Sequence, residues 1–189
     1  MFFPNDMTFQ YFFFDTYPGY FLQVLPIALI AGTVYGIFRF RKDGDTISGR
    51  KFLSCLFVCY MTGLVCLVLL LRPVSMMWYR LFYHASSGLS MRFFTWGFDL
   101  VPDFWTDLDS QTIGNFLMFL PFGFLYPFFK KDASFGRTLL AGFLCTLGIE
   151  LFQPVFGRAF DINDIIVNFA GTAVSAAVFF AVKGAAKKK

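Results

Sequence analysis

The sequence is poor in charge and nearly lacks histidine. Only 15% of its 189 residues are charged, one is histidine and four are cysteine, whereas 57% are hydrophobic. Soluble domains carry about 25% charged residues, so the composition excludes a water-soluble globular domain and a disordered chain. A disulfide-stabilised scaffold is excluded because the cysteines are too few and lie within hydrophobic runs. A membrane protein is the class that fits.

Five hydrophobic runs are long enough to cross a hydrocarbon core of about 30 Å as helices. The third and fourth contain prolines, which predict tilted or kinked helices. In the first, Gly32 and Gly36 form a pair of small residues that should let helices approach closely. We therefore expect an all-α polytopic membrane protein in which residues 1–189 form a single membrane domain. The runs are Tyr17–Phe38, Phe52–Leu71, Ile113–Phe129, Thr138–Phe156 and Ile162–Val182.

Lysine and arginine are distributed unevenly among the segments between these runs. Short cytoplasmic loops retain positive charge, and translocated loops lose it. With the N-terminus outside, all but four of the 16 basic residues fall on the cytoplasmic side. We therefore expect an extracellular N-terminus and a cytoplasmic C-terminus. The net charge of +4 then reflects membrane topology and does not indicate nucleic-acid binding.

Residues 72–112 form the longest segment between runs and are expected to be extracellular or interfacial. The first half mixes aromatic residues with arginine, a composition typical of a helix lying in the outer membrane interface. It contains the single histidine, His84, to which we assign no role. In the second half, Asp99 and Asp103 could bind a cation, whereas Asp109 is expected to cap the next helix.

The most informative residues are polar groups inside the last three runs. Each is costly in lipid unless it is paired or faces a cavity. Helical spacing places Asp161, Asp164, Asn168, Gly171 and Ser175 on one stripe of the fifth run. The depth of the polar groups in each run predicts that they converge in a pocket at the outer leaflet. The candidate ligand-binding residues are Asn115, Glu150, Gln153, Arg158, Asp161, Asp164 and Asn168.

The charges of this set are unbalanced, because three carboxylates accompany one arginine. Either Glu150 is protonated, or a bound cation or a cationic ligand group compensates. The oxygen donors would suit Mg²⁺ or Ca²⁺, and no other cofactor is evident. If the site is catalytic, Glu150 and Asp164 are the candidate acid and base, and Arg158 could hold an anionic group such as phosphate. Alternatively, the same residues only join three helices, through an ion pair of Arg158 with Asp161 and a hydrogen bond between Glu150 and Asn168.

The ordered spacing of these residues resembles the VanZ-like family of bacterial membrane proteins. The resemblance covers about residues 99–175 and rests on NFLMFLPFGFLYP from Asn115, IELFQ from Ile149 and RAFDINDIIVNFAG from Arg158. It implies a multi-pass protein of the bacterial cytoplasmic membrane, associated with resistance to the lipoglycopeptide teicoplanin. The family signature falls on Asn115, Pro121, Gly123, Glu150, Gln153, Arg158, Asp161, Asp164, Asn168 and Gly171.

Two functions are compatible with such a pocket in the lipid bilayer. In the first, which we favour, it engages a lipoglycopeptide antibiotic or a lipid-linked cell-wall precursor and so changes antibiotic sensitivity. In the second, the chain is an intramembrane enzyme acting on a lipid-linked or cell-wall substrate. Such an enzyme would need carboxylate- or metal-assisted chemistry, because the outer part of the cluster contains no serine, cysteine or histidine nucleophile.

Overall fold

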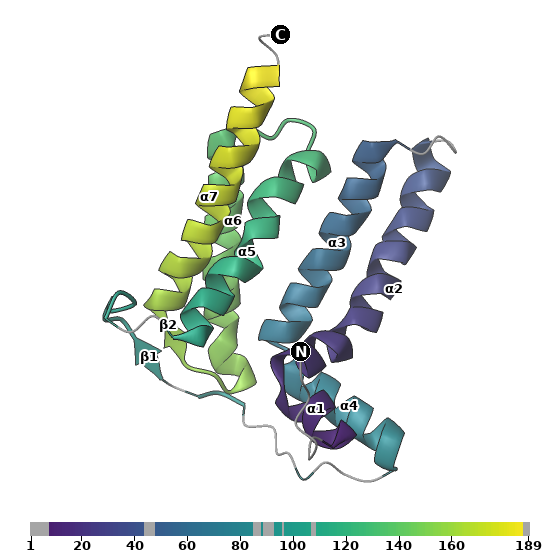
Figure 1. Cartoon of the computed structure of the whole chain (residues 1–189), viewed down its shortest axis with the longest axis vertical. Helices are drawn as coiled ribbons and strands as arrows, with labels where there is room; N and C mark the ends of the chain where they lie inside the picture. The colour runs from purple at the N-terminus through teal and green to yellow at the C-terminus, as the bar shows by residue number, and fades with distance from the viewer. Residues whose placement is uncertain are drawn as a thin grey trace.

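Five long helices form the body of the protein in a computed structural model that describes residues 8–43, 48–84, 88, 93–95, 97–106 and 109–186 (Figure 1). Each is long and apolar enough to cross a membrane, which confirms the five predicted spans and the all-α polytopic fold. The helices are α2 (Tyr17–Asp43), α3 (Gly49–Val68), α5 (Ser110–Phe129), α6 (Phe135–Phe152) and α7 (Ile162–Ala186).

Three of these helices begin earlier than the hydrophobic runs, and in α5 and α6 a capping side chain lies just before the first residue. Asp109 accepts a hydrogen bond from the backbone N–H of Thr112 at 2.7 Å and so caps α5, as expected. The same bond is the main cause of a pKa below the usual range for the Asp109 carboxyl. Ser134 caps α6 by accepting from the backbone N–H of Arg137 at 3.3 Å.

The long helices form two groups that meet through α3 (Figure 1). In one group α5 and α6 both pack on α7, and in the other α2 packs along α3. The surface between α3 and α5 is aromatic, with the rings of Phe57 and Phe122 5.6 Å apart between centroids. The hydroxyl of Tyr60 on α3 donates to the Met118 carbonyl on α5 at 2.9 Å. Packing and a hydrogen bond together therefore hold α3 against α5.

The C-terminal end of α5 is completed by side chains of α3. The last carbonyls of a helix have no partner within it and need one elsewhere. A guanidinium nitrogen of Arg50 donates to the Pro127 carbonyl at 3.4 Å, and Ser54 Oγ lies 3.0 Å from the Phe128 carbonyl oxygen. Side chains of α3 thus bind carbonyl groups that a glycine-based C-cap would otherwise satisfy.

The contact between α2 and α3 uses the small residues that the sequence indicated. A Cβ atom at Gly32 would lie 2.9 Å from the Cβ of Cys59, and one at Gly36 would lie 3.4 Å from Cys55 Sγ. All four cysteines are free thiols. Cys55 and Cys59 therefore serve as small packing residues at this helix pair.

Two shorter helices, α1 (Phe9–Asp15) and α4 (Leu71–Tyr83), lie beyond one end of α2 and α3 (Figure 1). The fully buried Gln23 of α2 joins them. Its side-chain amide donates to the Phe13 carbonyl of α1, its Oε1 accepts from the Ser75 hydroxyl of α4 at 2.6 Å, and its backbone carbonyl accepts from Trp78 at 2.8 Å. The sequence predicted the aromatic helix α4 but not this network.

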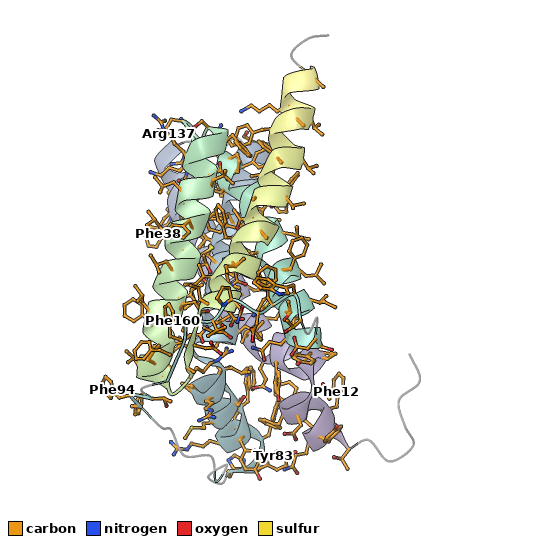
Figure 2. All side chains as sticks on the ribbon, turned by 90° about the vertical axis from the view of Figure 1, so that its left-hand side faces the viewer. Phe12, Phe38, Tyr83, Phe94, Arg137 and Phe160 are labelled. Carbon is orange, nitrogen blue, oxygen red and sulfur yellow. The ribbon has the colours of Figure 1, made fainter. Side chains whose placement is uncertain are left out.

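The two ends of the molecule differ in charge. Most of the described basic side chains, including Arg137, lie at the end where α2, α5 and α7 finish (Figure 2). At the other end a short parallel pair joins β1 (Phe98–Asp99) to β2 (Phe160–Asp161), with Phe98 opposite Phe160. We call these the basic end and the β-pair end. Figure 2 shows Phe160 between Arg137 and Tyr83, the last residue of α4.

Close packing of α5 on α7 depends on glycine. A Cβ atom at Gly171 would collide with the Phe116 carbonyl oxygen, and one at Gly123 would collide with Ser175 Oγ. At both contacts a glycine lets the two helices approach closely. Ser175 fits in the stripe because the facing residue is a glycine.

Replacing Gly171 by alanine is therefore expected to separate α5 from α7 and to destabilise the protein by about 1–3 kcal/mol. The matched control is Gly148→Ala on α6, because nothing lies within 4 Å of its Cβ position. That control should be neutral or stabilising by up to about 1 kcal/mol, since alanine favours helix. Thermal unfolding in detergent compares the two variants, and an equal loss in both would contradict the close approach.

Candidate functional site

The polar side chains predicted to converge meet where α5, α6 and α7 approach the β-pair end. Glu150 is 0% exposed, Gln153 1%, Asp164 8% and Asn168 4%, so all four are buried. Asn115 and Asp161 are half-buried beside them, and only Arg158 is exposed. The polar cluster, as we use the term, comprises Asn115, Glu150, Gln153, Arg158, Asp161, Asp164 and Asn168.

Glu150 is held where α6 ends. Its Oε1 accepts a hydrogen bond from Gln153 Nε2 at 2.6 Å, and its Oε2 accepts from the backbone N–H of Asp161 at 3.4 Å. Pro154 has no N–H to continue the helix, and a short 3-10 helix over Gln153–Phe156 turns the chain back toward Glu150. Both oxygens of this buried carboxyl group therefore have partners inside the protein.

Asp164 links α7 to α5. Its Oδ1 accepts from Asn115 Nδ2 at 2.6 Å. One turn earlier, Asp161 Oδ1 accepts from the backbone N–H of Asn163 at 2.8 Å and so supports the start of α7. The predicted convergence of Asn115 with the α7 stripe is therefore present in the structure.

Asn168 links α7 to α6 through a residue that sequence reasoning missed. Its Nδ2 donates to Thr146 Oγ1 at 3.1 Å, whereas the structural alternative had paired Asn168 with Glu150. Its Oδ1 and the Thr172 hydroxyl are buried without a hydrogen-bond partner among the described residues. Spacing could have indicated both threonines, because Thr146 lies one turn before Glu150 and Thr172 one turn after Asn168. The sequence pattern does not single out threonine, because burying its hydroxyl in a membrane helix costs less free energy than burying a carboxylate.

Arg158 is the exception among the predicted cluster residues. Its guanidinium donates to the Val68 carbonyl at the end of α3, at 3.3 Å. The structural alternative expected an ion pair with Asp161, but within the described parts of the chain Arg158 forms no ion pair shorter than 4.0 Å. The exposed guanidinium thus joins the two helix groups at the rim and stays accessible to an anionic group.

A covering segment, residues 97–106, is tied to the start of α7 by Asn163. The side-chain oxygen of Asn163 accepts from the backbone N–H groups of Asp103 and Phe104 at 2.9 and 3.1 Å. Its amide nitrogen donates to the Val101 carbonyl at 3.2 Å and to Asp103 Oδ1 at 3.0 Å. Sequence reasoning missed Asn163, because it lies off the buried stripe and its partners are mostly backbone groups of a distant loop.

The covering segment exposes several large apolar side chains. Phe98, Leu100, Val101 and Trp105 are each about 60% exposed. Exposed aromatic and aliphatic side chains at this position suit the boundary between water and lipid. An amphiphilic molecule approaching the polar cluster would therefore meet apolar side chains beside polar ones.

The polar cluster contains carboxyl and amide groups, which are possible ligands for a cation. Within the described residues no group of three or more histidine, cysteine, aspartate or glutamate side chains is placed to hold a metal ion. A divalent cation could also use amide and backbone oxygens, so the cation considered from the sequence stays a prediction.

The two buried threonines should respond differently to substitution. Thr146→Val removes the partner of Asn168 Nδ2 and is expected to cost about 1–3 kcal/mol, because a buried donor is left unpaired. Thr172→Val removes no hydrogen bond and should change stability by less than about 0.5 kcal/mol. Thermal unfolding in detergent measures both. An equally large loss in Thr172→Val would contradict the unpaired state of its hydroxyl.

Comparison with known proteins agrees with the signature that these residues form. The family described as VanZ/LLP1 matches residues 57–183, which include the covering segment and every residue of the polar cluster. Neither a curated protein nor a solved structure matches the chain. Because the match spans well over half of the 189 residues, this multi-pass membrane protein belongs to the VanZ/LLP1 family.

Proposed function

We propose that the polar cluster lies at the outer leaflet of the bacterial cytoplasmic membrane and binds an amphiphilic cell-envelope molecule, lowering sensitivity to teicoplanin. The ligand would be the lipoglycopeptide itself or a lipid-linked cell-wall precursor. One observation carries the proposal: a hydrogen-bonded cluster with buried Glu150 and Asp164 lies among three membrane helices, beside an exposed apolar covering segment. Family membership supports it further.

The distribution of charge supports this orientation. Arg39, Arg50, Arg137 and Lys183 belong to helix ends at the basic end, together with Lys130 just after α5. The positive-inside rule would place that end in the cytoplasm. The β-pair end, with the polar cluster, would then face outward.

The arrangement of groups suits a ligand that has a lipid anchor and a polar head. Half-buried Asn115 and Asp161 provide hydrogen-bonding groups at the rim, and exposed Arg158 provides a positive charge for a phosphate or carboxylate. The apolar side chains of the covering segment would contact an acyl chain. A lipidated glycopeptide partitions into this interface, whereas a glycopeptide without an acyl chain does not, so the proposal concerns teicoplanin more than vancomycin.

The orientation predicts opposite accessibility of two exposed positions, Leu100 in the covering segment and Lys131 at the basic end. In a background with the four native cysteines replaced by alanine, Leu100→Cys should react with an impermeant maleimide added to intact cells. Lys131→Cys should react only after the membrane is opened. The reverse pattern would place the cluster at the cytoplasmic face and would overturn the antibiotic-access proposal.

The function predicts a selective change in antibiotic susceptibility. Cells expressing the wild-type chain should tolerate more teicoplanin than empty cells, with little change toward vancomycin. The double variant Glu150→Gln, Asp164→Asn keeps oxygen acceptors at both positions but removes ionisable groups, and we expect it to lose the teicoplanin shift. Minimum inhibitory concentrations at matched membrane levels measure this.

Two controls separate function from folding. Asp132→Asn removes an exposed carboxylate at the basic end, where Asp132 pairs with Arg137, and should leave the shift unchanged. The unfolding temperature of the double variant should stay close to that of the wild type. Loss of folding together with the shift would favour the purely structural role, and no shift with the wild type would contradict the antibiotic proposal.

A further inference from the structure

An apolar groove lies between α3, α5 and α7 at the basic end, far from the polar cluster. Its volume is about 500 Å³. The walls are side chains of α5 and α7, among them Phe124, Phe128, Val178 and Val182. Because α5 and α7 are membrane spans that finish at this end, the groove lies near one end of the spans. The proposed function makes no use of it.

Two cations from different helices line this groove. Arg50 of α3 is half-buried, and one of its five N–H donors reaches the Pro127 carbonyl at 3.4 Å. Lys183 of α7 is exposed, and its ammonium lies 5.9 Å from the centre of the Phe179 ring, which also lines the groove. No carboxylate is among the described lining residues. Among the described lining residues, the groove thus combines apolar walls with two positive charges and no carboxylate.

We propose that this groove binds an acidic phospholipid, with the lipid phosphate between Arg50 and Lys183 and an acyl chain along Val178 and Phe128. Charge complementarity selects the headgroup, since a lipid with net negative charge gains from both cations and a zwitterionic lipid gains less. The apolar walls favour a ligand with an acyl chain and so disfavour a soluble anion, which has none. The proposal depends neither on which end is cytoplasmic nor on the function of the polar cluster.

Native mass spectrometry of the purified full chain in a neutral detergent tests the preference. Dioleoyl-phosphatidylglycerol should bind roughly tenfold more tightly than dioleoyl-phosphatidylcholine, which has the same chains. The double variant Arg50→Gln, Lys183→Gln should bring the ratio to about twofold or less. Lys131→Gln removes one positive charge from an exposed residue at the same end, outside the groove, and should keep the wild-type ratio.

A second variant guards against a folding defect, because Arg50 also contacts α5. Lys183→Gln alone leaves that contact in place and should lower the preference about threefold. Equal binding of both lipids to the wild type, or an unchanged ratio in the double variant, would overturn the proposal. Displacement of the acidic lipid by millimolar inorganic phosphate would overturn it too, because the groove would then be a site for a free anion.

Discussion

Hydrocarbon offers no hydrogen bonds, so a polar group buried in a membrane helix is costly unless it finds a partner within the protein. This constraint explains why α5, α6 and α7 lie together at the β-pair end. Asp164 pairs with Asn115 across α7 and α5, and Asn168 pairs with Thr146 across α7 and α6. Separating these helices would leave amide and carboxyl groups facing lipid. The glycines between α5 and α7 let the backbones come close enough for such short side chains to meet.

The same constraint shapes the parts of the chain that do not span the membrane. Glu150 accepts from the backbone of β2, so the turn after α6 is bound to the buried cluster. Asn163 in turn holds the covering segment against the start of α7 with its side-chain amide. A chain of hydrogen bonds therefore runs from the buried carboxyl group out to the apolar surface of the covering segment. The candidate site and the loop over it form one connected structure.

Much of this arrangement could be predicted from the sequence. The five spans follow from length and hydropathy, the Asp109 cap from residue type, and the meeting of Asn115 with Asp164 from the cost of polar groups in lipid. Gln23 escaped prediction because its partners Phe13 and Ser75 belong to short helices outside the spans. Asn163 escaped because most of its bonds are with backbone groups of a loop whose path the sequence pattern does not specify.

The C-terminal end of α5 depends on residues that precede the region shared with the family. The region shared with the family starts at residue 57, yet the side chains that reach the carbonyls of Pro127 and Phe128 belong to Arg50 and Ser54. A fragment cut at the family boundary would lack both and would leave the last turn of α5 to water or lipid headgroups. The smallest piece of this chain able to complete α5 in this way therefore includes Arg50 and Ser54, so the start of α3 belongs structurally with the shared region although it lies outside it.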